Sequence, residues 1–98
     1  MEVPKEEQYI QKLIKFFDET NIPYEKHIRE IRIRGRVLYT DLTLKQIKIE
    51  TSNGNYVEIW QMIKKMEVTI NNDLGEITKR IKGEYFISFR RGYLEIMY

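Results

Sequence analysis

The sequence predicts an α+β protein, with a mainly antiparallel sheet of five to six strands and two to three helices in the order α-β-β-β-α-β-α-β-β. Three observations predict this class. Residues 4–20 carry a helical apolar stripe, residues 24–51 alternate apolar and charged side chains, and residues 85–98 have the pattern of a hairpin. The chain has 98 residues, 42% of them hydrophobic, and no low-complexity linker, so we expect a single domain over residues 1–98.

The first predicted element is a helix over Pro4–Thr20. Its apolar face consists of residues spaced i, i+3, i+4 and i+7, namely Ile10, Leu13, Ile14 and Phe17. Pro4 suits a first helical turn, and Asn21 can adopt the left-handed conformation that ends a helix.

Three strands are predicted next, as an antiparallel meander within Tyr24–Thr51. In the first strand isoleucines alternate with arginines, and Arg34-Gly35 predicts a tight turn into a second strand, Val37–Leu44. The third strand, Gln46–Thr51, alternates isoleucines with polar residues. The meander should therefore have one apolar and one charged face.

The segment after this meander has two interpretations. Asn53-Gly54 is a hairpin signal and would make Asn55–Trp60 a fourth strand. The spacing of Tyr56, Trp60 and Ile63 favours instead a helix over Asn55–Met66.

A short strand over Glu67–Asn71 comes next. Asp73 and Glu76 then resemble a capping box and predict a short helix that ends at Gly83, with an apolar face of Leu74, Ile77 and Ile81.

The chain should end in a hairpin of Tyr85–Phe89 and Tyr93–Tyr98, with its turn at Arg90-Arg91-Gly92. Both faces of this hairpin carry aromatic residues. The last strand has few charges to protect an exposed edge, so a homodimer through edge pairing is one expectation.

Composition excludes several classes of site. The chain has no cysteine and one histidine, His27, which excludes disulfides, thiolate zinc sites and multi-histidine metal sites. No apolar run approaches the roughly 20 residues of a membrane span, and Met1–Lys5 is charged, unlike a signal peptide. We therefore expect an intracellular protein, cytoplasmic or in a host's cytoplasm, with no membrane partner and no small-molecule cofactor.

Two clusters of basic residues are the main electrostatic signal, because 17 basic and 15 acidic residues leave a net charge of only +2. The clusters consist of Arg32, Arg34 and Arg36, and of Lys79, Arg80, Lys82, Arg90 and Arg91. Arginine forks suit phosphates, and nearby tyrosines can stack on unpaired bases. The sequence therefore predicts a non-catalytic binding module that contacts nucleic acid or an acidic protein. The alternative is a solvated strand face whose arginines pair with Glu30, Glu84 or Glu95.

Acidic residues on adjacent predicted strands suggest an enzyme as the alternative function. Asp41 lies on the second predicted strand, and Glu50 and Lys48 lie on one face of the third. The predicted order of helix, three-stranded meander, helix and strand resembles the core of the PD-(D/E)xK nucleases. The resemblance implies that Asp41 and Glu50 bind Mg²⁺ or Mn²⁺ and that Lys48 helps to activate water, although the family's lysine position holds Ser52 here.

The composition is unusual, with fifteen isoleucines, no alanine and abundant lysine, glutamate and tyrosine. In this respect the chain resembles the small orphan proteins of hyperthermophilic archaeal viruses. The resemblance implies a thermophilic viral accessory protein that binds host or viral macromolecules, and it implies no site residues.

Overall fold

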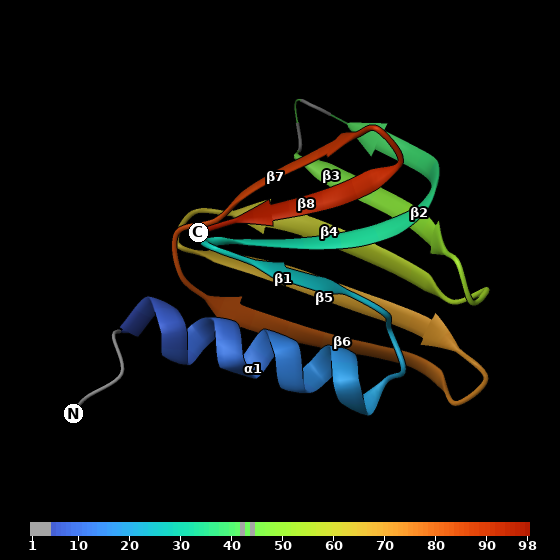
Figure 1. The fold of residues 1–98 in the computed structure, drawn as a ribbon, viewed down its shortest axis with the longest axis horizontal. Coiled ribbons are helices and arrows are strands. Elements are labelled where there is room, and N and C mark those ends of the chain that lie inside the picture. Colours follow the sequence, from blue (N-terminus) through green and yellow to red (C-terminus); the bar gives the residue numbers. More distant parts are fainter. Residues whose placement is uncertain (1–4, 42, 44) are drawn as a thin grey trace.

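The computed structural model describes residues 5–41, 43 and 45–98, which form one helix followed by eight antiparallel strands (Figure 1). The elements are α1 (Lys5–Glu19), β1 (Glu25–His27), β2 (Glu30–Asp41), β3 (Gln46–Thr51), β4 (Tyr56–Met62), β5 (Lys65–Asn72), β6 (Gly75–Lys82), β7 (Phe86–Arg90) and β8 (Tyr93–Met97). The expected antiparallel sheet after an N-terminal helix is confirmed. The expected two to three helices are wrong, and so is the count of five to six strands. Pro4 and Leu44, which bounded predicted elements, and Leu42, within the second predicted strand, lie outside the described residues.

The sheet has the strand order β6-β5-β4-β3-β2-β8-β7, with β1 paired to β2. β2 belongs to two halves of this sheet, because Glu30–Arg34 pair with β8 whereas Gly35–Asp41 pair with β3. Between these two parts β2 bends strongly (Figure 1). The backbone N–H of Ile87 in β7 donates to Oε1 of Gln61 in β4 at 3.3 Å, so the two halves meet again beyond the bend. The sheet thus curls around one core.

Gly35 lies at the bend of β2, where no side chain fits. A Cβ atom at this position would lie 2.6 Å from the carbonyl oxygen of Glu50 and 2.9 Å from Cδ1 of Ile49, both on β3. The N–H of Gly35 donates to the carbonyl of Gly92 at 3.0 Å. The tight turn predicted at Arg34-Gly35 is therefore wrong. The strand continues through the glycine, which allows the backbone of β3 to approach closely.

α1 packs against the inner face of the sheet, alongside β6 (Figure 1), and buries one stripe of apolar residues. These are Ile10, Leu13, Phe16 and Phe17. Asn21 has a φ of 59° and ends the helix as predicted, because the N–H of Ile22 donates back to the carbonyl of Phe17 at 2.9 Å.

Amide side chains from the β3–β4 turn and from the end of β5 hold the end of α1. Asn53 and Asn55 donate to the carbonyl of Asn21 at 2.7 and 3.3 Å, and Asn72 donates to the carbonyl of Thr20 at 3.2 Å. These bonds satisfy carbonyls that a helix end leaves without an intrahelical partner.

Two predicted helices are strands. The segment 55–66 contains β4, in which Val57 and Ile59 point into the core, and Ile63 lies in the following turn with 89% of its surface exposed. The segment 73–83 contains β6, and Leu74 lies in the turn before it with 76% exposed. The hairpin interpretation of Asn53-Gly54 was therefore the correct one.

The C-terminal hairpin is confirmed, with Arg91 and Gly92 in its turn at φ values of 55° and 80°. β8, however, lies between β2 and β7 and pairs with both strands. The last strand therefore has no free edge through which the dimer suggested by the sequence could form.

Candidate functional site

The outer face of β2, β8 and β7 gathers charged side chains. Strand register puts Arg32 opposite Glu95, and Arg34 and Arg90 on either side of Tyr93. Alternation explains this arrangement, because the intervening isoleucines of β2 point into the core and the arginines must then point outward. The β7–β8 turn adds Arg91 at the end of the same face.

These side chains line a hollow of about 360 Å³ whose wall consists of Arg32, Arg90, Arg91, Tyr93 and Glu95. Arg34 adjoins it, with its guanidinium carbon 5.5 Å from the ring centroid of Tyr93. We call these six residues the arginine cleft. Its arginines come from β2, from β7 and from the β7–β8 turn.

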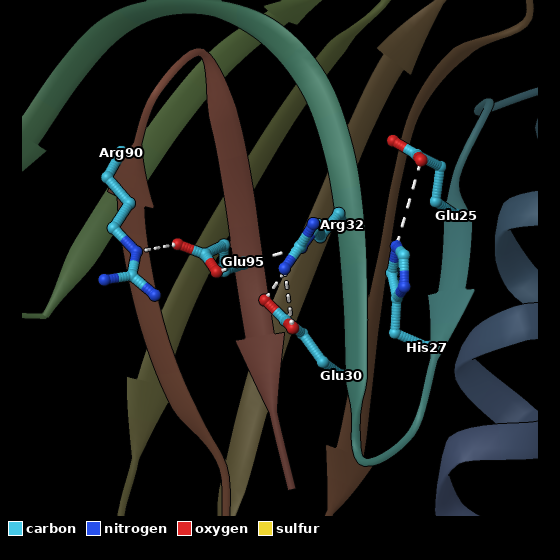
Figure 2. Close-up of polar contacts among 6 residues, drawn as sticks. All are labelled: Glu25, His27, Glu30, Arg32, Arg90 and Glu95. Carbon is cyan, nitrogen blue, oxygen red and sulfur yellow. Dashed lines mark hydrogen bonds and ion pairs between the residues drawn. The ribbon is translucent and has the colours of Figure 1, made fainter.

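Two carboxylates orient two of the arginines in the cleft (Figure 2). Glu95 is buried, with 3% of its surface exposed, and it accepts a hydrogen bond of 2.6 Å from Nε of Arg90. Arg32 donates to Glu30 through Nε at 3.1 Å and Nη2 at 3.3 Å, and its Nε lies 3.9 Å from Glu95. A buried carboxylate without a cation would be strongly destabilising, so Glu95 fixes the position of Arg90.

The same contacts shift three pKa values. Hydrogen bonding with Glu95, followed by that with Arg32, lowers the pKa of Glu30. The hydrogen bond to Glu30 raises the pKa of Arg32, and the hydrogen bond to Glu95 raises that of Arg90. Each shift favours the charged form of the group concerned, that is, of Glu30, Arg32 and Arg90.

Arg34 and Arg91 have no ion pair with any residue that the structure describes. A guanidinium has five N–H donors. Arg34 and Arg91 therefore present donors that no carboxylate occupies, beside Arg32 and Arg90, whose donors are partly used. The four arginines and the carboxylates of Glu30 and Glu95 together carry a formal charge of +2, and Glu25 lies opposite Arg32 on the neighbouring strand β1.

β1 continues this face with a surface contact, in which Nε2 of His27 lies 3.8 Å from Oε1 of Glu25 (Figure 2). Neither residue lines the cleft. His27 is therefore placed at the surface.

The remaining predicted nucleic-acid residues lie elsewhere. Arg36 pairs with Glu50 at 3.0 Å, and Arg80 pairs with Glu67 at 3.0 Å. Lys79 lies over the ring of Phe16 at 5.6 Å, and Lys82 is exposed on β6, at the opposite end of the strand order from β7. The second sequence cluster is therefore split. Arg90 and Arg91 join Arg32 and Arg34, whereas the three residues on β6 do not.

The residues of the nuclease hypothesis are not brought together. Asp41 lies opposite Gln46, whereas Glu50 lies opposite Arg36, so the two acids are four residues apart along β3, or about 13 Å. Lys48 lies over the ring of Tyr56 at 6.0 Å. Across residues 5–41, 43 and 45–98, no group of three acidic or histidine side chains is arranged to hold a metal ion.

Sequence reasoning missed how the cleft is assembled. It anticipated that arginines pair with Glu30 and Glu95, but not that Glu95 is buried or that Tyr93 lies between two arginines. The turn at Arg91-Gly92 could have predicted that Arg90 lies beside Tyr93, because a two-residue turn fixes the register of β7 and β8. The neighbour on the other side, β2, was not predictable from local pattern.

Comparisons with known proteins give no relative. No protein-family model matches the chain, and no characterised protein or solved structure shows a significant similarity. In the described part of the chain, no helix is long and apolar enough to span a membrane.

Proposed function

We propose that this protein is a small non-catalytic binding module whose arginine cleft contacts the phosphates of nucleic acid. One observation carries the proposal. Three arginines from three separate segments line one hollow and a fourth, Arg34, adjoins it, and two of the four have no acidic partner among the described residues.

The chemistry of the cleft supports a phosphate ligand. Guanidinium groups present planar forks of donors that match phosphate oxygens. Arg32 and Arg90 are already held by Glu30 and Glu95, so their remaining donors have fixed directions. The ring of Tyr93 lies among these arginines, where an unpaired base can stack on an aromatic side chain.

Binding should be local, because the charge of the chain is otherwise balanced. Arg36 and Arg80 are neutralised by glutamates, so they add little attraction for phosphate. Contacts to about two to four phosphates would give a salt dependence of log K on log salt with a slope of about −1.5 to −3.5.

The test is fluorescence anisotropy with labelled single-stranded RNA, single-stranded DNA and duplex DNA, from about 50 to 200 mM salt. The double variant Arg34→Gln/Arg91→Gln should bind at least about tenfold more weakly, with a slope shallower by about one to two. The matched control is Lys65→Gln/Lys82→Gln, which removes the same charge from two exposed lysines that lie opposite each other on β5 and β6. This control should retain most of the affinity.

Two outcomes would contradict the proposal. The first is an absence of binding to any of the three nucleic acids at about 50 mM salt. If polyglutamate bound to the cleft in that case, we would conclude that the partner is an acidic protein and not a nucleic acid. The second is an equal loss of affinity in the two double variants, which would mean that net charge, and not the cleft, attracts the ligand.

A further inference from the structure

We infer that the arginine cleft takes a terminal phosphate of a nucleic-acid strand, that is, a phosphate monoester and not an internal phosphodiester. This inference rests on the proposed function and names the part of the nucleic acid that the site would recognise.

The charge of the cleft matches a terminal phosphate. The six cleft residues carry a formal charge of +3, and Glu30, which binds Arg32, lowers the charge of the whole group to +2. A phosphate monoester carries about −1.5 to −2 at neutral pH, whereas each internal phosphodiester carries −1. A monoester would therefore nearly neutralise the cleft together with Glu30, and one internal phosphate would leave this group positively charged.

The shape of the surface favours one end of a strand over a long segment. The hollow is confined to the side chains of β2, β8, β7 and the β7–β8 turn. The next arginine along β2, Arg36, is already paired with Glu50. The basic residues of β6 lie at the other end of the strand order. An extended strand needs a continuous basic track, and the described surface has a basic hollow in place of one.

The donors in the cleft also suit a monoester. A terminal phosphate presents three strong acceptor oxygens. Arg34 and Arg91 can each offer a complete fork, and Arg90 keeps both Nη groups because only its Nε is bonded to Glu95. Arg32 uses Nε and one N–H of Nη2 on Glu30, which leaves three donors. Forks from several directions match a tetrahedral group with three free oxygens better than a planar carboxylate.

Tyr93 favours a nucleic-acid end over a phosphorylated peptide. Its ring is partly exposed within the cleft and already contacts Arg34. A terminal nucleoside beside the phosphate would have this aromatic and guanidinium surface to stack on. A phosphoserine carries no ring, so it would lose that contact.

The experiment compares single strands of one sequence, about 12 nucleotides long, with a 5′-phosphate, a 3′-phosphate or hydroxyls at both ends. We expect at least one phosphorylated strand to bind about tenfold more tightly than the hydroxyl strand at about 150 mM salt, a difference of about 1.4 kcal/mol. Arg34→Gln/Arg91→Gln should abolish this difference, and Lys65→Gln/Lys82→Gln should preserve it. The strand end with the larger gain identifies which terminus is recognised.

The outcomes separate this inference from the proposed function. Equal binding of phosphorylated and hydroxyl strands, both lost in the Arg34/Arg91 variant, would overturn the terminal-phosphate inference and leave nucleic-acid binding intact. Failure of all strands to bind would overturn both proposals. In competition, a nucleoside monophosphate should displace the strand better than inorganic phosphate or a phosphoserine peptide. If the peptide is the stronger competitor, the ligand is a phosphoprotein and the inference is wrong.

Discussion

Gly35 and Glu95 are the two residues on which the cleft depends most. Gly35 lets β3 approach the bend of β2, and its N–H holds the β7–β8 turn through the carbonyl of Gly92. Glu95 fixes Arg90 from beneath. Both residues act through position, since one has no side chain and the other is almost wholly buried.

Replacement of Gly35 by alanine should lower the free energy of unfolding by about 2 kcal/mol, the typical cost of forcing extra atoms into a packed site. The added methyl group would meet backbone oxygen, which cannot rotate away as a side chain can. Urea unfolding followed by the fluorescence of Trp60 measures the effect. Thr40→Ala is the control, because Thr40 is exposed on the same strand and its loss should cost less than about 1 kcal/mol. Equal stability of Gly35→Ala and the parent protein would show that the strand does not need its glycine.

Three residues misled the sequence-based prediction, because their surroundings in the fold differ from those their residue types usually indicate. Ile63 and Leu74 are apolar, so they suggested buried helix positions, yet both lie at exposed hairpin tips. Gly35 suggested a turn, although its role is a long-range contact with β3. For all three residues, the environment in the folded protein depends on segments that are distant in sequence, which local pattern does not reveal.

The helix α1 is attached to the sheet through the carbonyls at its C-terminal end as well as through its apolar face. Asn53 and Asn55 come from the β3–β4 turn, and Asn72 comes from the end of β5. A helix terminus carries partial negative charge on its carbonyls, which these amide donors satisfy.

Asn53→Asp should reduce stability by about 1 to 2 kcal/mol, because it replaces a donor with an anion that faces the carbonyl of Asn21. Ser52→Asp adds the same charge to the same turn at an exposed residue, and it should change stability by less than about 0.5 kcal/mol. Thermal and urea unfolding of the two variants separate the lost hydrogen bond from the added charge. Similar losses in both would mean that the amide contributes little.

The pattern of residues identified α1, β3, β5 and the last hairpin, but it failed for β4 and β6. In β4, Tyr56 and Trp60 point outward while Val57 and Ile59 point inward, so apolar residues on both faces imitate helical spacing. In β6, Lys79 occupies an inward position between Ile77 and Ile81 and interrupts the alternation. Both segments are strands because they pair with neighbouring strands, and this pairing outweighs the local pattern.

The shared strand β2 joins the two halves of the sheet. Its first part pairs with β8 and its second part with β3. The core is correspondingly one cluster, with buried residues from α1 and from strands in both halves. The two halves should therefore unfold together.

Hydrogen exchange should reveal this arrangement. Amides of β8 should be protected as long as those of Glu30–Arg34, because β8 is paired on both sides and Leu94 and Ile96 are fully buried. Amides of β6, the strand at one end of the sheet, should exchange earlier. Mass spectrometry of peptic fragments measures both. Exchange of β8 before β6 would contradict the central position of the last strand.

Local pattern supplied the class of the molecule and four of the six cleft residues, because Arg32, Arg34, Arg90 and Arg91 were all predicted binding residues. Their meeting was not predictable, since it depends on β8 lying between β2 and β7. The separation of Lys79, Arg80 and Lys82 from Arg91 has the same cause. These basic residues are close in sequence and so suggested one cluster, but the strand order separates β6 from the β7–β8 turn.

The carboxylate contacts in the cleft also have an entropic consequence. Fixing a long side chain during association costs about 0.5 to 1.5 kcal/mol. Arg32 and Arg90 lose that freedom when the chain folds, because Glu30 and Glu95 already restrain them. Only Arg34 and Arg91 would still have rotamers to lose on binding, so they could adjust to a ligand while the other pair remains a rigid frame.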